Sequence, residues 1–169
     1  MKKTVLTFGL LSGAVVAVMM FLTVPFAERI GFDRSVIVGY TTIVISMLFV
    51  YFGVRSYRDN VLGGEVTFGR AFRAGLLIAV ISSVCYVLAW LVLFYFFIPD
   101  FADQYAAYVV ESVRGNGGSQ AQIDAAIKQA DNMKAMLANP IINAAVAFIE
   151  PLPVGLLVAL ISAVVLRKR

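Results

Sequence analysis

Four long apolar stretches, separated by shorter polar segments, dominate the hydrophobic pattern of this 169-residue chain. Residues 4–27, 35–54 and 74–99 carry no charge, and residues 135–166 carry a single one, on Glu150. A helix needs about 20 apolar residues to cross the hydrocarbon core of a bilayer, at roughly 1.5 Å per residue. The pattern therefore predicts an all-α integral membrane protein, a bundle of four transmembrane helices that forms one domain. We expect the spans at residues 4–27, 35–54, 71–98 and 141–166.

The polar segment between the third and fourth spans, residues 100–139, is too long to be a turn. Its first part repeats aromatic residues at helical spacing: Phe101, Tyr105 and Tyr108. The glycine-rich residues 115–118 then end this helix, and Ser119 with Gln122 forms the S-x-x-Q capping box that starts a second one. We therefore predict an external helical hairpin. An alternative interpretation makes this hairpin a lid over a ligand-binding site.

Lysine and arginine residues are distributed unevenly between the two sides of the spans. The side that holds both termini carries nine basic and two acidic residues, whereas the opposite side carries five basic and seven acidic residues. Because basic residues near span ends favour the cytoplasmic side, both termini are predicted to be cytoplasmic. Orientation in the membrane thus accounts for the formal charge of +4, so we expect a lipid bilayer and no nucleic acid as a partner.

The composition argues against several kinds of active site. The chain has no histidine, so it lacks the commonest general base and the commonest metal ligand. Its one cysteine, Cys85, lies inside the third apolar stretch, where we expect it to act as a small apolar residue. We therefore expect no enzymatic activity, no metal and no cofactor.

Small residues recur every four positions in three of the spans, where they would form a flat stripe along one helix face. The stripes consist of Gly9, Gly13 and Ala17; of Gly75 and Ala79; and of Gly155, Ala159 and Ala163. Such stripes let two helix backbones approach closely, which is a main source of packing energy in lipid. We expect these faces to be helix contacts, although small residues are also simply common in membrane helices.

Glu150 is the residue that a purely structural account of the spans does not easily explain. An acid near the centre of a membrane helix costs about 2.5–3.5 kcal/mol on insertion scales, and such residues usually face a bundle interior or a water-filled cavity. Pro151 and Pro153 follow it, and neither can donate a backbone hydrogen bond. The residue before a proline also disfavours helical geometry, so we predict a kink or break at Glu150. A broken helix with an acid at the break is a pattern found in transporters.

Depth in the membrane selects the polar side chains that could reach Glu150. On the second and third spans these are Thr42, Ser46, Tyr86 and Trp90, and Asn143 lies two turns away on the same face of the fourth span. Three interpretations stay open: a structural acid that is hydrogen-bonded or partly hydrated, a proton or cation site, and a contact for a partner at the outer surface.

Aromatic residues gather at the outer end of the third span, in Trp90 and residues 94–97. This is where an aromatic belt at the membrane–water interface is expected. An aromatic binding pocket is the alternative interpretation.

Three segments of the chain resemble a known family. They are GGEVTFGRAF at residues 63–72, IPDF at residues 98–101, and PLPVGL at residues 151–156, which runs into LISA at residues 160–163. Together with the four spans and the long outer hairpin, they resemble the domain of unknown function 4199 family of small bacterial membrane proteins. The resemblance implies a location in the bacterial inner membrane. It implies no activity, cofactor or catalytic residue.

Two functions from different classes fit these observations. The first is a non-enzymatic structural or accessory protein that acts through its helix faces or its hairpin, with a second copy or another membrane protein as partner. The second is a small oligomeric transporter or channel with Glu150 as a proton or cation site. A polar cavity that reaches the surface at Glu150 would favour transport, and a dry, closed contact would favour a structural role.

Overall fold

The computed structural model describes residues 1–167, except for the side chain of Glu28, and in this part of the chain the regular structure is helical. Helix α1 (Lys2–Thr23) runs into the 3₁₀ turn η1 (Val24–Phe26) and the short α2 (Ala27–Ile30). Helix α3 (Phe32–Val61) returns, and α4 (Phe68–Val92) ends in the π-helical segment η2 (Leu93–Phe97). The hairpin consists of α5 (Phe101–Gly115) and α6 (Gln120–Ala138), and α7 (Pro140–Ile149) and α8 (Leu152–Leu166) complete the chain.

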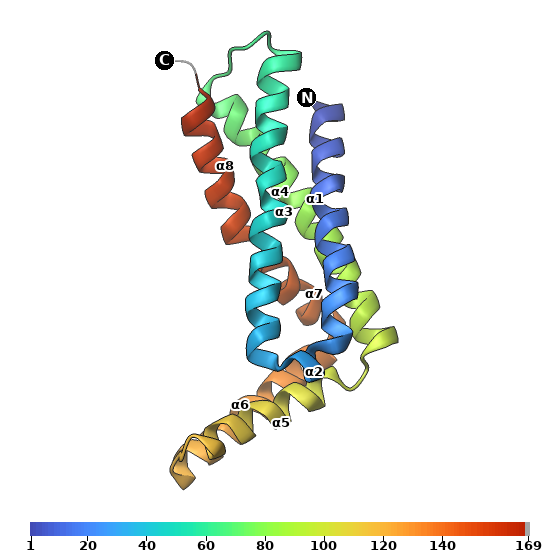
Figure 1. Ribbon diagram of the computed structural model, residues 1–169, viewed down its shortest axis with the longest axis vertical. Coiled ribbons are helices and arrows are strands. Elements are labelled where there is room, and N and C mark those ends of the chain that lie inside the picture. The colour runs from blue at the N-terminus through green and yellow to red at the C-terminus, as the bar shows by residue number, and fades with distance from the viewer. Residues whose placement is uncertain (168–169) are drawn as a thin grey trace.

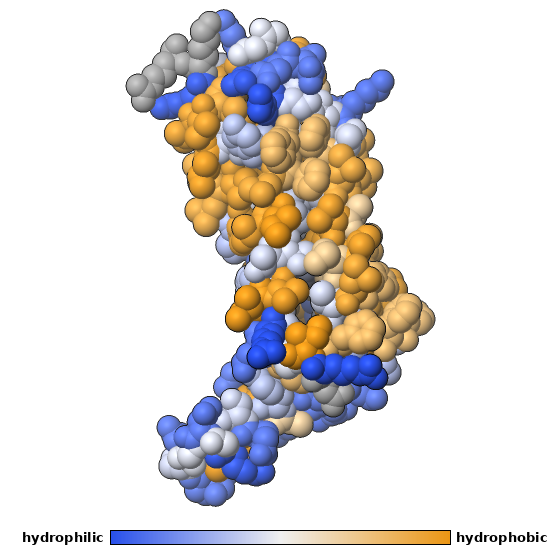
Figure 2. Space-filling model, in the orientation of Figure 1, coloured by the Kyte–Doolittle hydropathy of each residue, from blue (hydrophilic) through white to orange (hydrophobic). Residues whose placement is uncertain are grey.

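Four helical segments in the described residues are long and apolar enough to cross a membrane: Lys2–Phe26, Phe32–Val61, Phe68–Phe97 and Pro140–Leu166. Both termini lie at one end of these segments, and the α5–α6 hairpin projects from the other (Figure 1). We call these the terminus end and the hairpin end. Figure 2 shows a band of apolar side chains over the long helices, with polar side chains at both ends. The predicted all-α membrane fold with four spans and a hairpin is confirmed.

Helix α4 lies at the centre of the four segments, because it packs against α1, α3, α7 and α8. Its contact with α8 joins two small-residue stripes. A Cβ atom added to Gly155 would lie 2.7 Å from the Cβ of Ala79, and one added to Gly75 would lie 3.0 Å from the Cβ of Ala159. Ala163, further along α8, is fully buried. The backbones of α4 and α8 therefore lie closer together than larger side chains at these positions would permit.

The contact between α1 and α4 is equally close. A Cβ atom added to Gly9 would lie 2.7 Å from Cγ2 of Ile81, and one added to Gly13 would lie 2.6 Å from the Sγ of Cys85. Ala17, the third member of this stripe, is half-buried against the core. The small-residue stripes of α1 and α8 thus pack against two different faces of α4.

A buried serine cluster joins three helices near the middle of the molecule. The hydroxyl of Ser12 on α1 donates to the carbonyl oxygen of Ser46 on α3 at 2.7 Å, and its oxygen lies 2.8 Å from the hydroxyl oxygen of Ser82 on α4. All three residues are fully buried. Each hydroxyl therefore has a partner inside the apolar core, as a buried polar group requires.

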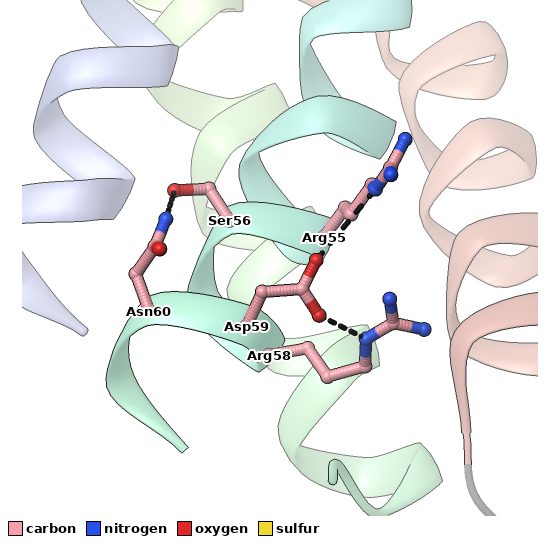
Figure 3. Close-up of polar contacts among 5 residues, drawn as sticks. All are labelled: Arg55, Ser56, Arg58, Asp59 and Asn60. Carbon is pink, nitrogen blue, oxygen red and sulfur yellow. Dashed lines mark hydrogen bonds and ion pairs between the residues drawn. The ribbon is translucent and has the colours of Figure 1, made fainter. Parts of the chain in front are cut away.

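Helix α3 is longer than its apolar stretch and continues at the terminus end to Val61. Figure 3 shows the polar contacts of this extension. The Nε atom of Arg58 donates to Oδ1 of Asp59 at 2.6 Å, and Arg55 lies 3.6 Å from Oδ2 of the same carboxylate. Ion pairs and hydrogen bonds along the helix surface thus support the α3 turns beyond the apolar stretch.

The two helices of the hairpin contact each other, and α5 also contacts the start of α3. Lys134 of α6 forms an ion pair with Asp103 of α5. The predicted capping box at the start of α6 is present, with Ser119 and Gln122 bonded reciprocally. The aromatic face of α5 packs on Phe32, whose ring centroid lies 6.3, 5.8 and 5.0 Å from those of its partners, Phe101, Tyr105 and Tyr108. The hydroxyl of Tyr108 also donates to Asp33.

The close approach of α4 to its neighbours predicts which substitutions destabilise the fold. We expect Gly13→Leu and Ala159→Leu each to lower the free energy of unfolding by about 1–3 kcal/mol, because each overpacks a tight contact. Chemical unfolding in detergent micelles measures this change. Gly69→Leu is the control, because a Cβ atom at Gly69 meets nothing within 4 Å. Equal stability of all three variants would place the stripes against lipid.

Candidate functional site

The fourth span is interrupted at Glu150. Helix α7 ends at Ile149, Glu150 and Pro151 form a turn, and α8 begins at Leu152. The predicted break is therefore present, but Glu150 keeps right-handed helical angles, φ −58° and ψ −52°, so the expectation that it leaves helical geometry is wrong. The cause of the break is the missing hydrogen-bond donors of Pro151, which is buried, and of Pro153.

The two halves of this span pack against different neighbours. Helix α8 lies against α3 and α4, whereas α7 lies against α4 and α6. Between α1, α3, α4 and α7 this arrangement leaves a cavity of about 380 Å³ in the hairpin half of the molecule. Residues of α5 and α6, among them Tyr105 and Leu137, line the cavity from the hairpin side.

The carboxylate of Glu150 lies on the wall of this cavity. Its Oε2 atom accepts a hydrogen bond of 2.7 Å from the hydroxyl of Tyr86 on α4. Tyr86 is buried, whereas the side chain of Glu150 is exposed on its other side. Within residues 1–167, no lysine or arginine nitrogen lies within 4.0 Å of this carboxylate. Glu150 is thus an acid with one neutral partner and an open face.

A second polar pair lies further toward the hairpin, one turn along α4 and two turns along the fourth span. The indole N–H of Trp90 donates to Oδ1 of Asn143 at 2.8 Å, and the side-chain NH₂ of Asn143 donates to the carbonyl oxygen of Leu137 at 3.2 Å. Asn143 is 1% exposed, so both of its polar atoms are paired inside the protein. This network joins α4 to α7 and to the end of α6, and it fixes the indole ring at the cavity wall.

The floor of the cavity lies directly above the serine cluster. Val16, Thr42 and Tyr86 line the cavity, and each lies four residues, about one helical turn, from Ser12, Ser46 or Ser82. Below this level the small-residue stripes close the space between the helices. The cavity therefore ends near the middle of the molecule.

The side of the cavity is open between α3 and α7. Val36 and Tyr40 on α3 and Val146 on α7 line it, and they are 49%, 50% and 45% exposed. Gly39 lies between the first two, and a Cβ atom there would meet nothing within 4 Å. This mouth lies on the apolar surface of the span-forming helices.

Some of the side chains proposed from the sequence as partners of Glu150 lie elsewhere. Thr42 lines the cavity but donates to the carbonyl oxygen of Val38 on its own helix, at 2.8 Å. Ser46 donates to the carbonyl of Ile43 and belongs to the serine cluster. Trp90 binds Asn143 instead, so Tyr86 is the candidate that contacts the acid.

Sequence reasoning missed three residues of this region: Ser12, Ser82 and Tyr40. Ser12 and Ser82 carry the buried cluster, and the signal for it in the sequence was their position near the packing stripes, Ser12 beside Gly13 and Ser82 three residues after Ala79. Tyr40 was missed because the depth comparison on the second span began at Thr42, one half-turn further in.

A family model for proteins of unknown function, DUF4199, matches residues 7–168. The chain belongs to this family. The family resemblance expected from the sequence is therefore confirmed, and it covers the spans, the hairpin and the site alike. No curated protein and no solved structure matches the chain. The family description assigns no activity, so a proposal about function has to rest on the site.

The Trp90–Asn143 pair yields a test of the site's architecture. Trp90→Phe should lower the free energy of unfolding by about 1–3 kcal/mol, because it leaves the buried amide oxygen of Asn143 without a donor. In an Asn143→Leu background the same change should cost much less, because the acceptor is already gone. Unfolding in detergent of the two single variants and the double variant measures the coupling. Equal losses in both backgrounds would show that the hydrogen bond contributes nothing.

Proposed function

We propose that this protein is a non-enzymatic, membrane-embedded solute-binding protein of the transporter type, in which Glu150 is the charged group of the binding cavity. The observation that carries this proposal is the position of the Glu150 carboxylate, at a helix break and on the wall of a cavity of about 380 Å³. Ligand pockets are commonly apolar with a few polar groups that orient the ligand. Broken helices supply such groups in transporters.

The surroundings of Glu150 favour binding over a purely structural role. A structural acid in a membrane helix is expected to be enclosed by donors, since an unpaired charge is costly there. Glu150 instead has Tyr86 on one side and the open cavity on the other. The face of the Glu150 carboxylate that lacks a protein partner is therefore suited to bind a group of a solute.

The arrangement of α7 and α8 supports movement at the site. Helix α8 is held by the tight contact of Gly155 and Ala159 with α4, whereas α7 is separated from it by the Glu150–Pro151 turn. A tilt of α7 at this turn would break its hydrogen bonds to Tyr86 and Trp90 on α4 but would leave the contact of α8 with α4 in place. In the present state the cavity is open sideways between α3 and α7 and ends below at the level of the serine cluster.

We further infer a bacterial inner-membrane location with both termini cytoplasmic, so that the cavity lies in the outer half of the bilayer. Support comes from the nine basic residues at the terminus end against five at the hairpin end.

A second candidate is an accessory role through the hairpin. Helices α5 and α6 extend well beyond the membrane-spanning segments, and α5 has no fully buried residue (Figure 1). A second copy of the chain or another membrane protein could contact such a surface. A purely accessory protein would not bind solutes in the cavity, so the experiment below separates the two candidates.

A cavity-filling variant tests the binding function. Gly39→Leu should abolish binding of the neutral probe phenylbutanol to the purified protein in uncharged detergent, because its side chain extends into the mouth without a clash at Cβ. Isothermal titration calorimetry measures binding. Gly69→Leu, at an open position far from the cavity, is the matched control and should bind like the wild type. Identical titrations for both variants would contradict the proposal.

Orientation is tested by cysteine accessibility in a Cys85→Ala background. A cysteine at Gly117, at the hairpin tip, should react with a membrane-impermeant maleimide in intact cells. A cysteine at Gly63, between α3 and α4, should react only after lysis. The reverse result would place the cavity in the inner half of the bilayer.

A further inference from the structure

The cavity has a distinctive chemical lining. Glu150 is the one charged residue among the described residues that form it. Aromatic side chains supply much of the remaining wall: Phe32, Tyr40, Tyr86, Trp90, Phe101 and Tyr105. A carboxylate together with aromatic faces is the combination that binds organic cations, because both attract positive charge.

The geometry points to a free lipophilic amine as the solute, with its protonated amino group against Glu150 and its apolar body against the aromatic wall. This inference rests on the proposed binding function and names its substrate class. The Oε2 atom of Glu150 is bonded to Tyr86, and the face toward the cavity has no cationic partner in the described chain. A protonated amine supplies that missing charge in a medium of low dielectric constant.

The position of the mouth adds the requirement for a lipophilic body. Val36, Tyr40 and Val146 line the cavity and are also exposed at the lipid-facing surface between α3 and α7. A solute that partitions into the bilayer therefore reaches Glu150 sideways. The volume of about 380 Å³ lies within the range of about 300–1,000 Å³ that holds drug-sized ligands.

Other charged solutes fit this cavity less well. An anion would meet the Glu150 carboxylate without a basic side chain to balance it. The ammonium group of phosphatidylethanolamine has the right charge, but its phosphate would also need a basic partner. An inorganic cation requires several oxygen ligands, whereas most of this wall is aromatic or aliphatic.

Three probes with one carbon skeleton and different charge test the inference. Phenylbutylamine, phenylbutanol and phenylbutyrate would be titrated into the purified protein in uncharged detergent. Trp90, the one tryptophan of the chain, lies on the cavity wall and reports binding there by its fluorescence. The amine, protonated at neutral pH like that of lysine, should bind at least about tenfold more tightly than the alcohol, and the carboxylate should bind most weakly.

Glu150→Gln should remove the preference for the amine over the alcohol, because glutamine carries no charge but still offers an oxygen to Tyr86. The comparison of the three probes on the wild-type protein tests the cation inference even if this variant fails to fold. Equal affinities of the amine and the alcohol, both lost in Gly39→Leu, would overturn the cation inference while the binding function stands. No Gly39-sensitive binding of either compound would overturn the binding function itself.

Displacement of the amine by an equimolar amount of dihexanoyl-phosphatidylethanolamine would assign the ammonium group to a lipid and overturn the free-amine form.

Discussion

The close approach of α4 to α1 and α8 is the constraint on which the rest of the structure depends. Gly13 lies against Cys85 on one face of α4, and Gly155 lies against Ala79 on another. In lipid there is little hydrophobic force between helices, so van der Waals contact of this kind is a main source of cohesion. Because small residues interlock at only one rotation of each helix, these contacts also decide which side chains face the interior.

The polar groups in the core are consistent with that arrangement. Ser12, Ser46 and Ser82 form a closed cluster, and the polar atoms of Asn143 are satisfied by Trp90 and Leu137. Every buried side-chain nitrogen or oxygen in the described residues has a partner. Against this background the open face of Glu150 stands out, since an acid in a membrane segment is costly unless it is paired or hydrated.

The break at Glu150–Pro151 connects the rigid part of the molecule to the open part. On the terminus side, α8 is locked onto α4 through the close contacts of Gly155 and Ala159. On the hairpin side, α7 turns toward α4 and α6, and the cavity lies between α7 and α3. The hairpin then contributes to the wall through Phe101 and Tyr105, so the segment outside the spans is also part of the site.

Local patterns in the sequence determined the number of spans, the hairpin with its Ser119 cap, and the interruption at Pro151. Each of these follows from neighbouring residues: a long uncharged run, a capping box, or a missing N–H. The tertiary structure alone decided that Tyr86, and not Thr42 or Ser46, contacts Glu150. Depth along a span can be counted in the sequence, but the rotation of each helix about its axis is set by packing against its neighbours. The cavity could not be predicted for the same reason, because it is the space left where α7 turns away from α3, and no single segment encodes that space.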